Sequence, residues 1–225
     1  MSKKDEEVIV DVEGLYSKSE KWIEQNRQSV YIAIAAVVIV VAGYFYYTRS
    51  ILAPMQEEAQ LEMFQAQHYF EQDSLQLAMY GDAQGHLGFE QIADDYSSTP
   101  VGDLANYYMG VSLLRSGEYQ LAIDYLESYS GSDPLVAPNA IGNVGDAYLE
   151  LGDLEQAKAS YLKAARSGNN ELITPRYLMK AGMVAEELGN YEEALNLYSE
   201  LSEEYSATIE GRNAKKYMAR VKTMV

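Results

Sequence analysis

The chain has 225 residues, 48% of them hydrophobic, and a formal net charge of −17 at pH 7. Such a negative surface repels nucleic acids and anionic lipid headgroups, which argues against a nucleic-acid-binding function. Cysteine is absent, so disulfides, thiolate metal sites and thiol nucleophiles are excluded, and a folded domain must be stabilised by packing.

The first 27 residues form a charged tail with two predicted parts. Residues 3–13 mix charge with a few aliphatic residues and are too short to fold alone, so we expect them to be extended or disordered. Residues 15–27 predict a short amphipathic helix, because Leu15, Trp22 and Ile23 fall on one side at helical spacing. We expect Trp22 to rest at the inner membrane interface. The alternative is that this helix docks a cytoplasmic or intramembrane partner.

Residues 28–48 are uncharged and mostly apolar, and they predict a transmembrane helix. Twenty-one residues at about 1.5 Å each give roughly 31 Å of helix, close to the ~30 Å hydrocarbon thickness of a bilayer. Tyr44, Tyr46 and Tyr47 lie near the end of this run, where an interfacial aromatic belt is expected.

The charges on either side of the run predict its orientation. Five Lys or Arg precede it and Arg49 follows it, and positive charge near a span is retained on the cytoplasmic side. A cleaved signal peptide is the competing interpretation, but the preceding region is long and acidic and no small-residue cleavage site follows. We therefore expect a cytoplasmic N-terminus, an uncleaved anchor in a bacterial inner membrane, and residues 49–225 in the periplasm.

The second half of the chain repeats itself. The columns Gly, Gly and Ala recur with separations of 7 and 5 residues in three copies: Gly110, Gly117, Ala122; Gly145, Gly152, Ala157; and Gly182, Gly189, Ala194. We predict a repeated helical hairpin, in which the first Gly permits close helix approach, the second ends the first helix, and the Ala packs where no larger side chain fits.

This spacing resembles the tetratricopeptide repeat, whose period is about 34 residues. The resemblance implies a solenoid of helical hairpins. Together with the N-terminal transmembrane helix predicted above, this gives an all-α fold. The three copies cover about 103–136, 138–171 and 175–208, and a solvating end helix covers 208–224. A divergent copy is expected over 54–100, with helices at 55–70 and 86–96, an insertion over 72–85, and Gly88 in the small packing column.

No catalytic constellation is present in the sequence. His68 and His86 have no metal-ligand spacing, and adjacent acidic pairs such as Glu192-Glu193 diverge by about 100° on a helix, so they cannot flank one substrate atom. We expect no catalytic residue, no metal and no cofactor, and we classify the protein as not an enzyme.

Hairpin repeats present a curved surface lined by the first helix of each pair, and we predict a protein-binding surface there. We call it the first-helix surface, and its expected members are Tyr107, Val111, Leu114, Arg115, Asn139, Asp146, Leu149, Arg176, Met179, Met183 and Glu186. Aromatic and Met side chains suit adaptable contact with extended polypeptide. The alternative is that several of these residues pack against neighbouring helices instead.

The layout of charged tail, single span and exported helical repeats, with the segment Tyr96-Ser97-Ser98-Thr99-Pro100, resembles the YfgM-like family of ancillary Sec translocon subunits. That resemblance implies association with the SecYEG channel and a PpiD-type membrane-anchored periplasmic chaperone, and assistance to exported polypeptides. The alternative function is a structural scaffold for another cell-envelope assembly, such as outer-membrane assembly, secretion or division.

Overall fold

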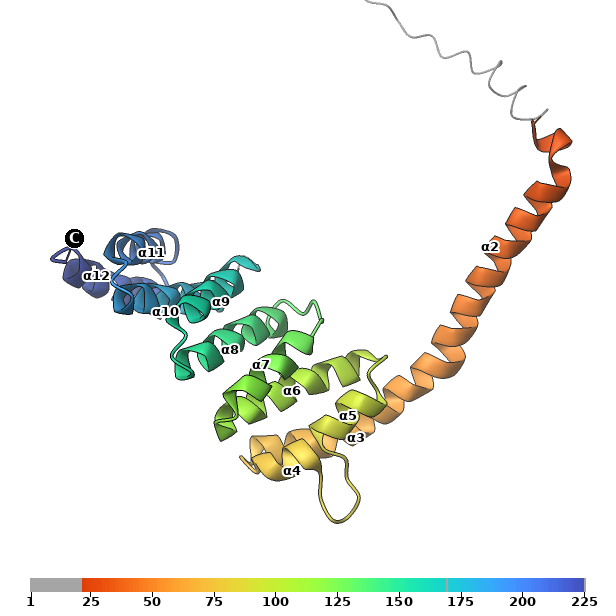
Figure 1. Cartoon of the computed structure of the whole chain (residues 1–225), viewed down its shortest axis with the longest axis horizontal. Coiled ribbons are helices and arrows are strands. Elements are labelled where there is room, and N and C mark those ends of the chain that lie inside the picture. Colours follow the sequence, from red (N-terminus) through yellow and green to blue (C-terminus); the bar gives the residue numbers. More distant parts are fainter. Residues whose placement is uncertain (1–21, 169, 225) are drawn as a thin grey trace, which may run out of the picture. The chain divides into compact units, whose positions relative to one another are not determined.

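The computed structural model describes residues 22–168 and 170–224. Over these residues it is helical without strands, as the sequence predicts, and it divides into two compact units, Met1–Ala53 and Pro54–Val225. Each unit is described separately, and Figure 1 gives the element labels.

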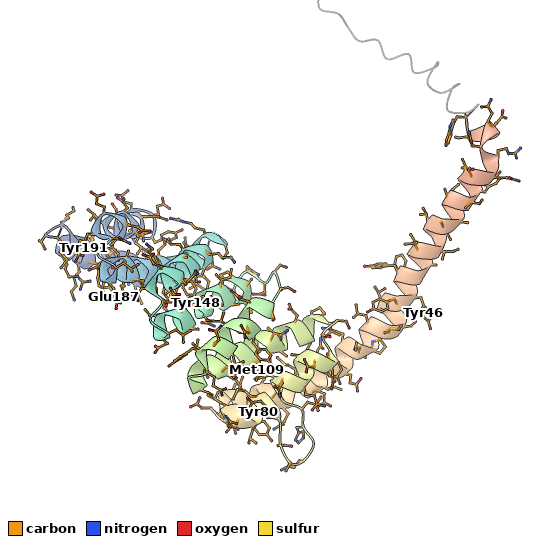
Figure 2. All side chains as sticks on the ribbon, viewed as in Figure 1. Tyr46, Tyr80, Met109, Tyr148, Glu187 and Tyr191 are labelled. Atoms are coloured by element: carbon orange, nitrogen blue, oxygen red, sulfur yellow. The ribbon has the colours of Figure 1, made fainter. Side chains whose placement is uncertain are left out.

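The first unit contains the apolar helix α2 (Arg27–Tyr47), followed by a π-helical turn, η1 (Thr48–Leu52). None of the residues of α2 is buried, and side chains project from it on all sides, including that of Tyr46 (Figure 2). A helix that is apolar all round, and none of whose residues is buried by the described part of the chain, is suited to a lipid environment. By length and composition it can cross a membrane.

Most of the predicted tail lies outside the described residues, so its predicted conformations stay predictions. Its last residues, from Trp22, are helical up to a turn at Asn26. Trp22 is exposed, as are Tyr44, Tyr46 and Tyr47 in α2.

The second unit consists of ten helices among the described residues. They are α3 (Ala53–Glu71), α4 (Leu75–Tyr80), α5 (Phe89–Asp95), α6 (Pro100–Ser116), α7 (Tyr119–Ser128), α8 (Val136–Glu150), α9 (Leu154–Arg166), α10 (Thr174–Glu187), α11 (Tyr191–Glu204) and α12 (Ile209–Val221). The pairs α6 and α7, α8 and α9, and α10 and α11 form three successive hairpins, which stack side by side (Figure 1). This is the repeat solenoid that the Gly-Gly-Ala columns predict.

The same turn closes each hairpin. Gly117, Gly152 and Gly189 have φ of 83°, 79° and 76°, in the left-handed region where glycine carries no Cβ penalty. In each turn the backbone N–H of the residue after the glycine donates a hydrogen bond to the carbonyl five residues earlier. The N–H of Glu118, for example, donates to the Leu113 carbonyl at 2.9 Å. This is the Schellman arrangement, which satisfies the last carbonyls of the first helix.

The helices of each hairpin touch at the first glycine column. A Cβ on Gly145 would lie 2.7 Å from the Tyr161 ring, and one on Gly182 would lie 2.6 Å from the Tyr198 ring. At Gly110 the side chain of Leu126 takes the place of the tyrosine, again at 2.6 Å. The alanines of the third column, Ala122, Ala157 and Ala194, are 0% exposed. Small residues therefore fix how closely the two helices of a hairpin approach.

The segment before the hairpins departs from the predicted divergent copy. Its insertion contains the short helix α4, and the second helix begins at Phe89 rather than at His86. Gly88 is the N-cap residue of α5, and a Cβ there would clash with the backbone of Met79 and Gly81. The prediction that Gly88 fills the small packing column is therefore wrong, because the inserted chain shifts the start of this helix.

The core of the second unit is divided along the stack into three apolar clusters. The first joins α3, α4, α5 and α6 around Met79, Phe89 and Met109, the last of which is labelled in Figure 2. The second joins α7 and α8, and the third extends from α9 to α12 around Tyr161, Tyr177 and Tyr198. Each helix thus packs mainly on its sequence neighbours, which is the expected energetics of a repeat solenoid.

Candidate protein-binding surface

The predicted first-helix surface is distributed over three helices. Tyr107, Val111, Leu114 and Arg115 lie on α6; Asn139, Asp146 and Leu149 lie on α8; and Arg176, Met179, Met183 and Glu186 lie on α10. Arg115, Arg176 and Met183 are exposed, and the other members are half-buried. The surface is therefore partly occupied by contacts within the chain, and these contacts decide which residues can reach a partner.

Asp146 sits at the centre of one such contact. Its carboxylate accepts a hydrogen bond from the Tyr161 hydroxyl at 2.5 Å, and the Lys180 ammonium lies 2.6 Å and 2.8 Å from its two oxygens. The same ammonium lies 5.3 Å and 5.6 Å from the ring centroids of Tyr161 and Tyr177. Burial, together with the adjacent carboxylate, raises the pKa of the Tyr161 hydroxyl well above its ordinary value. Asp146 therefore ties α8 to α9 and α10.

Glu186 makes the equivalent contacts in the following repeat. It accepts a hydrogen bond from the Tyr198 hydroxyl at 2.6 Å, and its two oxygens accept from the Arg220 guanidinium at 2.7 Å and 3.1 Å. Arg220 also lies over the Tyr217 ring, 4.9 Å from its centroid. Glu186 thus fastens α12 to the last hairpin.

Ion pairs recur between adjacent repeats at sequence separations of 34 or 35 residues. Asp146 with Lys180, Arg166 with Glu200, and Glu186 with Arg220 are each 34 residues apart, and Lys158 with Glu193 is 35 apart. The separation is close to the 35- and 37-residue offsets between the three copies, so each pair joins equivalent helices of neighbouring copies. Sequence reasoning missed this ladder, although opposite charges separated by one period were a signal that could have revealed it.

Two further members of the predicted surface have partners inside the chain. Asn139 accepts a hydrogen bond from the Tyr177 hydroxyl at 2.9 Å. Arg115 lies over the Phe70 ring at 4.5 Å from its centroid, and 3.9 Å from the carboxylate of Asp73. The hydrogen bond ties Asn139 to Tyr177 of α10, and Arg115, whose side chain is half exposed, lies at the edge of the surface.

A pocket of about 360 Å³ opens over the Asp146 contact. It is lined by Asp146, Leu149, Tyr161, Lys180, Met183, Val184 and Glu187. Met183 is 47% exposed beside it, and Glu187, labelled in Figure 2, lies at the end of α10. The pocket combines apolar side chains with one fixed ion pair, and its volume is in the range of small binding sites. Sequence reasoning named Asp146, Leu149 and Met183 but missed Tyr161, Lys180 and Glu187.

A second pocket, of about 470 Å³, lies between α7, α8 and α9. Its apolar lining comes from Leu126, Ala140 and Val144, and its polar lining includes Glu127 and Lys163. The helix α7 has 10 residues, whereas α9 has 13, so the shorter helix leaves some of α8 uncovered.

Each histidine contacts a polar side chain four residues away, His68 with Gln72 and His86 with Asp82. His86 contacts the Asp82 carboxylate at 2.7 Å, and the same carboxylate accepts from the Tyr69 hydroxyl and from two backbone N–H groups. These hydrogen bonds, that from Tyr69 most of all, hold the pKa of Asp82 far below its usual range. Among the described residues no three His, Asp or Glu side chains gather to hold a metal ion. Asp82 therefore organises the loop between α4 and α5.

A family model described as tetratricopeptide repeat matches residues 145–207. The match runs from the first glycine column of the second hairpin to just beyond α11. A search of curated proteins found no match to the chain. Tetratricopeptide repeats bind proteins through extended surfaces of stacked helices, so the match points to a protein partner in general. By fold and by this match, the second unit is an all-helical repeat solenoid similar to tetratricopeptide proteins.

Proposed function

We propose that this protein is a non-enzymatic protein-binding module, anchored in the inner membrane by α2, which binds polypeptide on the first-helix surface. The observation that carries the proposal is the pocket beside Met183, where apolar side chains surround a preformed Asp146 and Lys180 pair. An apolar side chain of a polypeptide can enter this pocket, while Glu187 at its rim contacts the neighbouring backbone or charge.

The floor of this pocket is preorganised, which favours binding. Asp146, Tyr161 and Lys180 already contact one another, so they lose little conformational freedom when a ligand arrives. Met183 is exposed and unbranched, and it can adapt to different apolar side chains. A fixed floor with an adaptable wall suits a protein that accepts several polypeptides.

The more specific form of the proposal is an accessory subunit of the Sec translocon with its repeat domain in the periplasm. In this role it recruits a PpiD-type chaperone or assists exported polypeptides near SecYEG. The support is the resemblance of layout, with a charged tail, one apolar helix and helical repeats. Native-level pull-down in mild detergent followed by mass spectrometry should recover translocon subunits, and their absence contradicts this specific role.

A structural scaffold for another envelope assembly is the second candidate, because a repeat solenoid also holds stable folded partners. Photocrosslinking from position 107 or 183 separates the two. Many unfolded or nascent exported chains support the first function, whereas one folded partner supports the scaffold.

Substitution at the pocket tests the binding surface itself. Met183→Glu should reduce crosslinking of exported polypeptides by about tenfold, because it places a charge beside an apolar pocket. Leu121→Glu on α7 is the matched control, since Leu121 is 48% exposed and lies outside the first-helix surface. Equal losses in both variants would contradict the proposed site.

A further inference from the structure

The helix α12 is a second copy of the start of α6, shifted by 109 residues. The segments align as Tyr96 with Tyr205, Thr99 with Thr208, Gly102 with Gly211, Tyr108 with Tyr217 and Met109 with Met218. The geometry repeats as well: Thr99 and Thr208 are N-caps, each accepting a hydrogen bond from its aligned glycine at 3.0 Å. A Cβ on either glycine would clash with the carbonyl of the aligned tyrosine. In sequence and in N-cap geometry, α12 therefore corresponds to α6, the first helix of a hairpin.

The face of α12 that corresponds to the hairpin contact is uncovered. On α6 this face includes Gly110, against which Leu126 of α7 packs, with Tyr107 and Leu114 next to the cluster of α7 and α8. The aligned residues of α12 are Ala219, Lys216 and Thr223, and all three are exposed. Within the described residues no helix lies on this side of α12.

This open face is strongly basic. Five of the 17 Lys and Arg residues of the chain lie in residues 212–222, and no Asp or Glu follows Glu210. Arg220 turns inward to Glu186, and Arg212 donates to the Ala207 carbonyl at 2.6 Å. The remaining three, Lys215, Lys216 and Lys222, are exposed and make no ion pair with any described residue. They surround Ala219.

Helix stability accounts for only some of these charges: Arg220 and Lys222, at the C-terminal end of α12, are favoured by the helix dipole, but Lys215 and Lys216 are not. Arg212 with Lys215 and with Lys216 are like-charge pairs at i,i+3 and i,i+4, which destabilise a helix. Arg212 also lies in the first half of α12, where a positive charge opposes the helix dipole. The predicted solvating role requires polar residues on this face but not positive ones, since the chain otherwise relies on 34 Asp and Glu. A cluster of positive charge on the open face of an acidic protein points to a function in recognition.

We propose that this face of α12 binds an acidic amphipathic helix of a partner protein, which takes the place of a second hairpin helix. Ala219 allows the close approach that Gly110 allows on α6, and the lysines flank the contact and meet the acidic residues of the partner. A helix is about 10 Å wide and can touch this face alone. A membrane surface or a nucleic acid is larger and would also meet the acidic remainder of the domain, which repels both.

Binding of a synthetic probe to the full-length protein in mild detergent tests the proposal. The probe is a fluorescent helical peptide of about 20 residues with a leucine stripe flanked by glutamates. Lys215→Gln/Lys216→Gln/Lys222→Gln should weaken binding by about tenfold or more, with a smaller salt dependence. The matched control Gln60→Glu/Gln120→Glu/Gln156→Glu changes net charge equally at exposed positions and should leave binding within about twofold of wild type.

Two further comparisons separate a docked helix from general charge attraction. Ala219→Trp should abolish binding of the probe, because the indole blocks close approach of the two helices. Since position 219 is exposed, the variant should fold normally and give the circular dichroism spectrum of the wild-type protein. A peptide of the same composition with the leucine stripe scrambled should bind at least about tenfold more weakly. Unchanged binding by Ala219→Trp or by the scrambled peptide overturns the proposal. So does lysine-dependent binding of phosphatidylglycerol vesicles or duplex DNA that exceeds binding of the probe. If Met183→Glu does not reduce crosslinking of exported polypeptides, the test of α12 is unaffected, since the two sites lie on different helices.

Discussion

Single glycine residues set the geometry of each hairpin. Gly145 and Gly182 lie against the rings of Tyr161 and Tyr198, and each ring is held by a carboxylate through its hydroxyl. Because the ring cannot move without losing that hydrogen bond, the glycine cannot be enlarged freely. The spacing of small residues in the sequence predicts a close approach, but the identity of the opposing ring follows only from the packed structure.

Substituting Gly145 tests this packing. Gly145→Ala should lower the free energy of unfolding by about 1–3 kcal/mol, because the new methyl group overpacks the Tyr161 ring. Chemical denaturation of the full chain in mild detergent, followed by circular dichroism, measures the change. Gly168→Ala is the control, since a Cβ there meets open space and should change stability by less than about 0.5 kcal/mol. Equal stability of the two variants would rule out the tight contact.

Alkaline pH tests the buried Tyr161 hydroxyl. Burial first, and then the hydrogen bond to Asp146, raise the pKa of Tyr161 in the folded protein above the 10.0 of an exposed tyrosine. The buried, neutral Tyr161 hydroxyl therefore stabilises the folded state fully below about pH 10. This contribution to the free energy of unfolding is lost as pH rises toward the pKa of Tyr161 in the folded state. Tyr161→Phe should melt at a lower temperature at neutral pH, but its melting temperature should fall less steeply above about pH 10. Parallel pH profiles of variant and wild type would contradict this assignment.

At the scale of elements, the predicted hairpins agree with the observed ones because glycine turns are local signals. Gly117, Gly152 and Gly189 each end a helix for a reason that resides in the glycine itself. The segment from α3 to α5 was predicted less well, because helix α4 and the Asp82 loop are held by contacts with Tyr69 and His86 that periodicity does not encode. The equivalence of α6 and α12 also escaped the sequence reasoning, since it spans three periods.

The two matching N-caps predict equal effects. Thr99→Ala and Thr208→Ala should each lower the free energy of unfolding by about 1 kcal/mol, because each hydroxyl accepts a backbone N–H that otherwise has no partner. Thermal unfolding measures both. Thr223→Ala is the control: its hydroxyl donates to the Arg220 carbonyl after α12 has ended and should contribute little. A large loss in the control, or none in the two caps, would exclude this explanation.

At the scale of the whole molecule, the absence of cysteine allows a direct test of topology. We expect Ser206→Cys, at an exposed position in the second unit, to react with a membrane-impermeant maleimide in intact spheroplasts. Ser2→Cys should react only after lysis, because the tail is predicted to be cytoplasmic. Labelling of Ser2→Cys in intact spheroplasts, or protection of Ser206→Cys, would contradict the proposed orientation.

Local signals in the amino-acid sequence were enough to predict an apolar helix long enough to span a bilayer, glycine-ended hairpins and an all-helical repeat. These follow from hydropathy, backbone freedom and period, which need no knowledge of distant residues. Which polar residues are free to meet a partner follows from the packed structure. Asp146, Asn139 and Glu186, which the sequence predicts for binding, also hold neighbouring helices, while Lys215, Lys216 and Lys222 stay open. The physical reason is that a side chain's availability depends on partners about one repeat away, and a single sequence shows spacing but not contact.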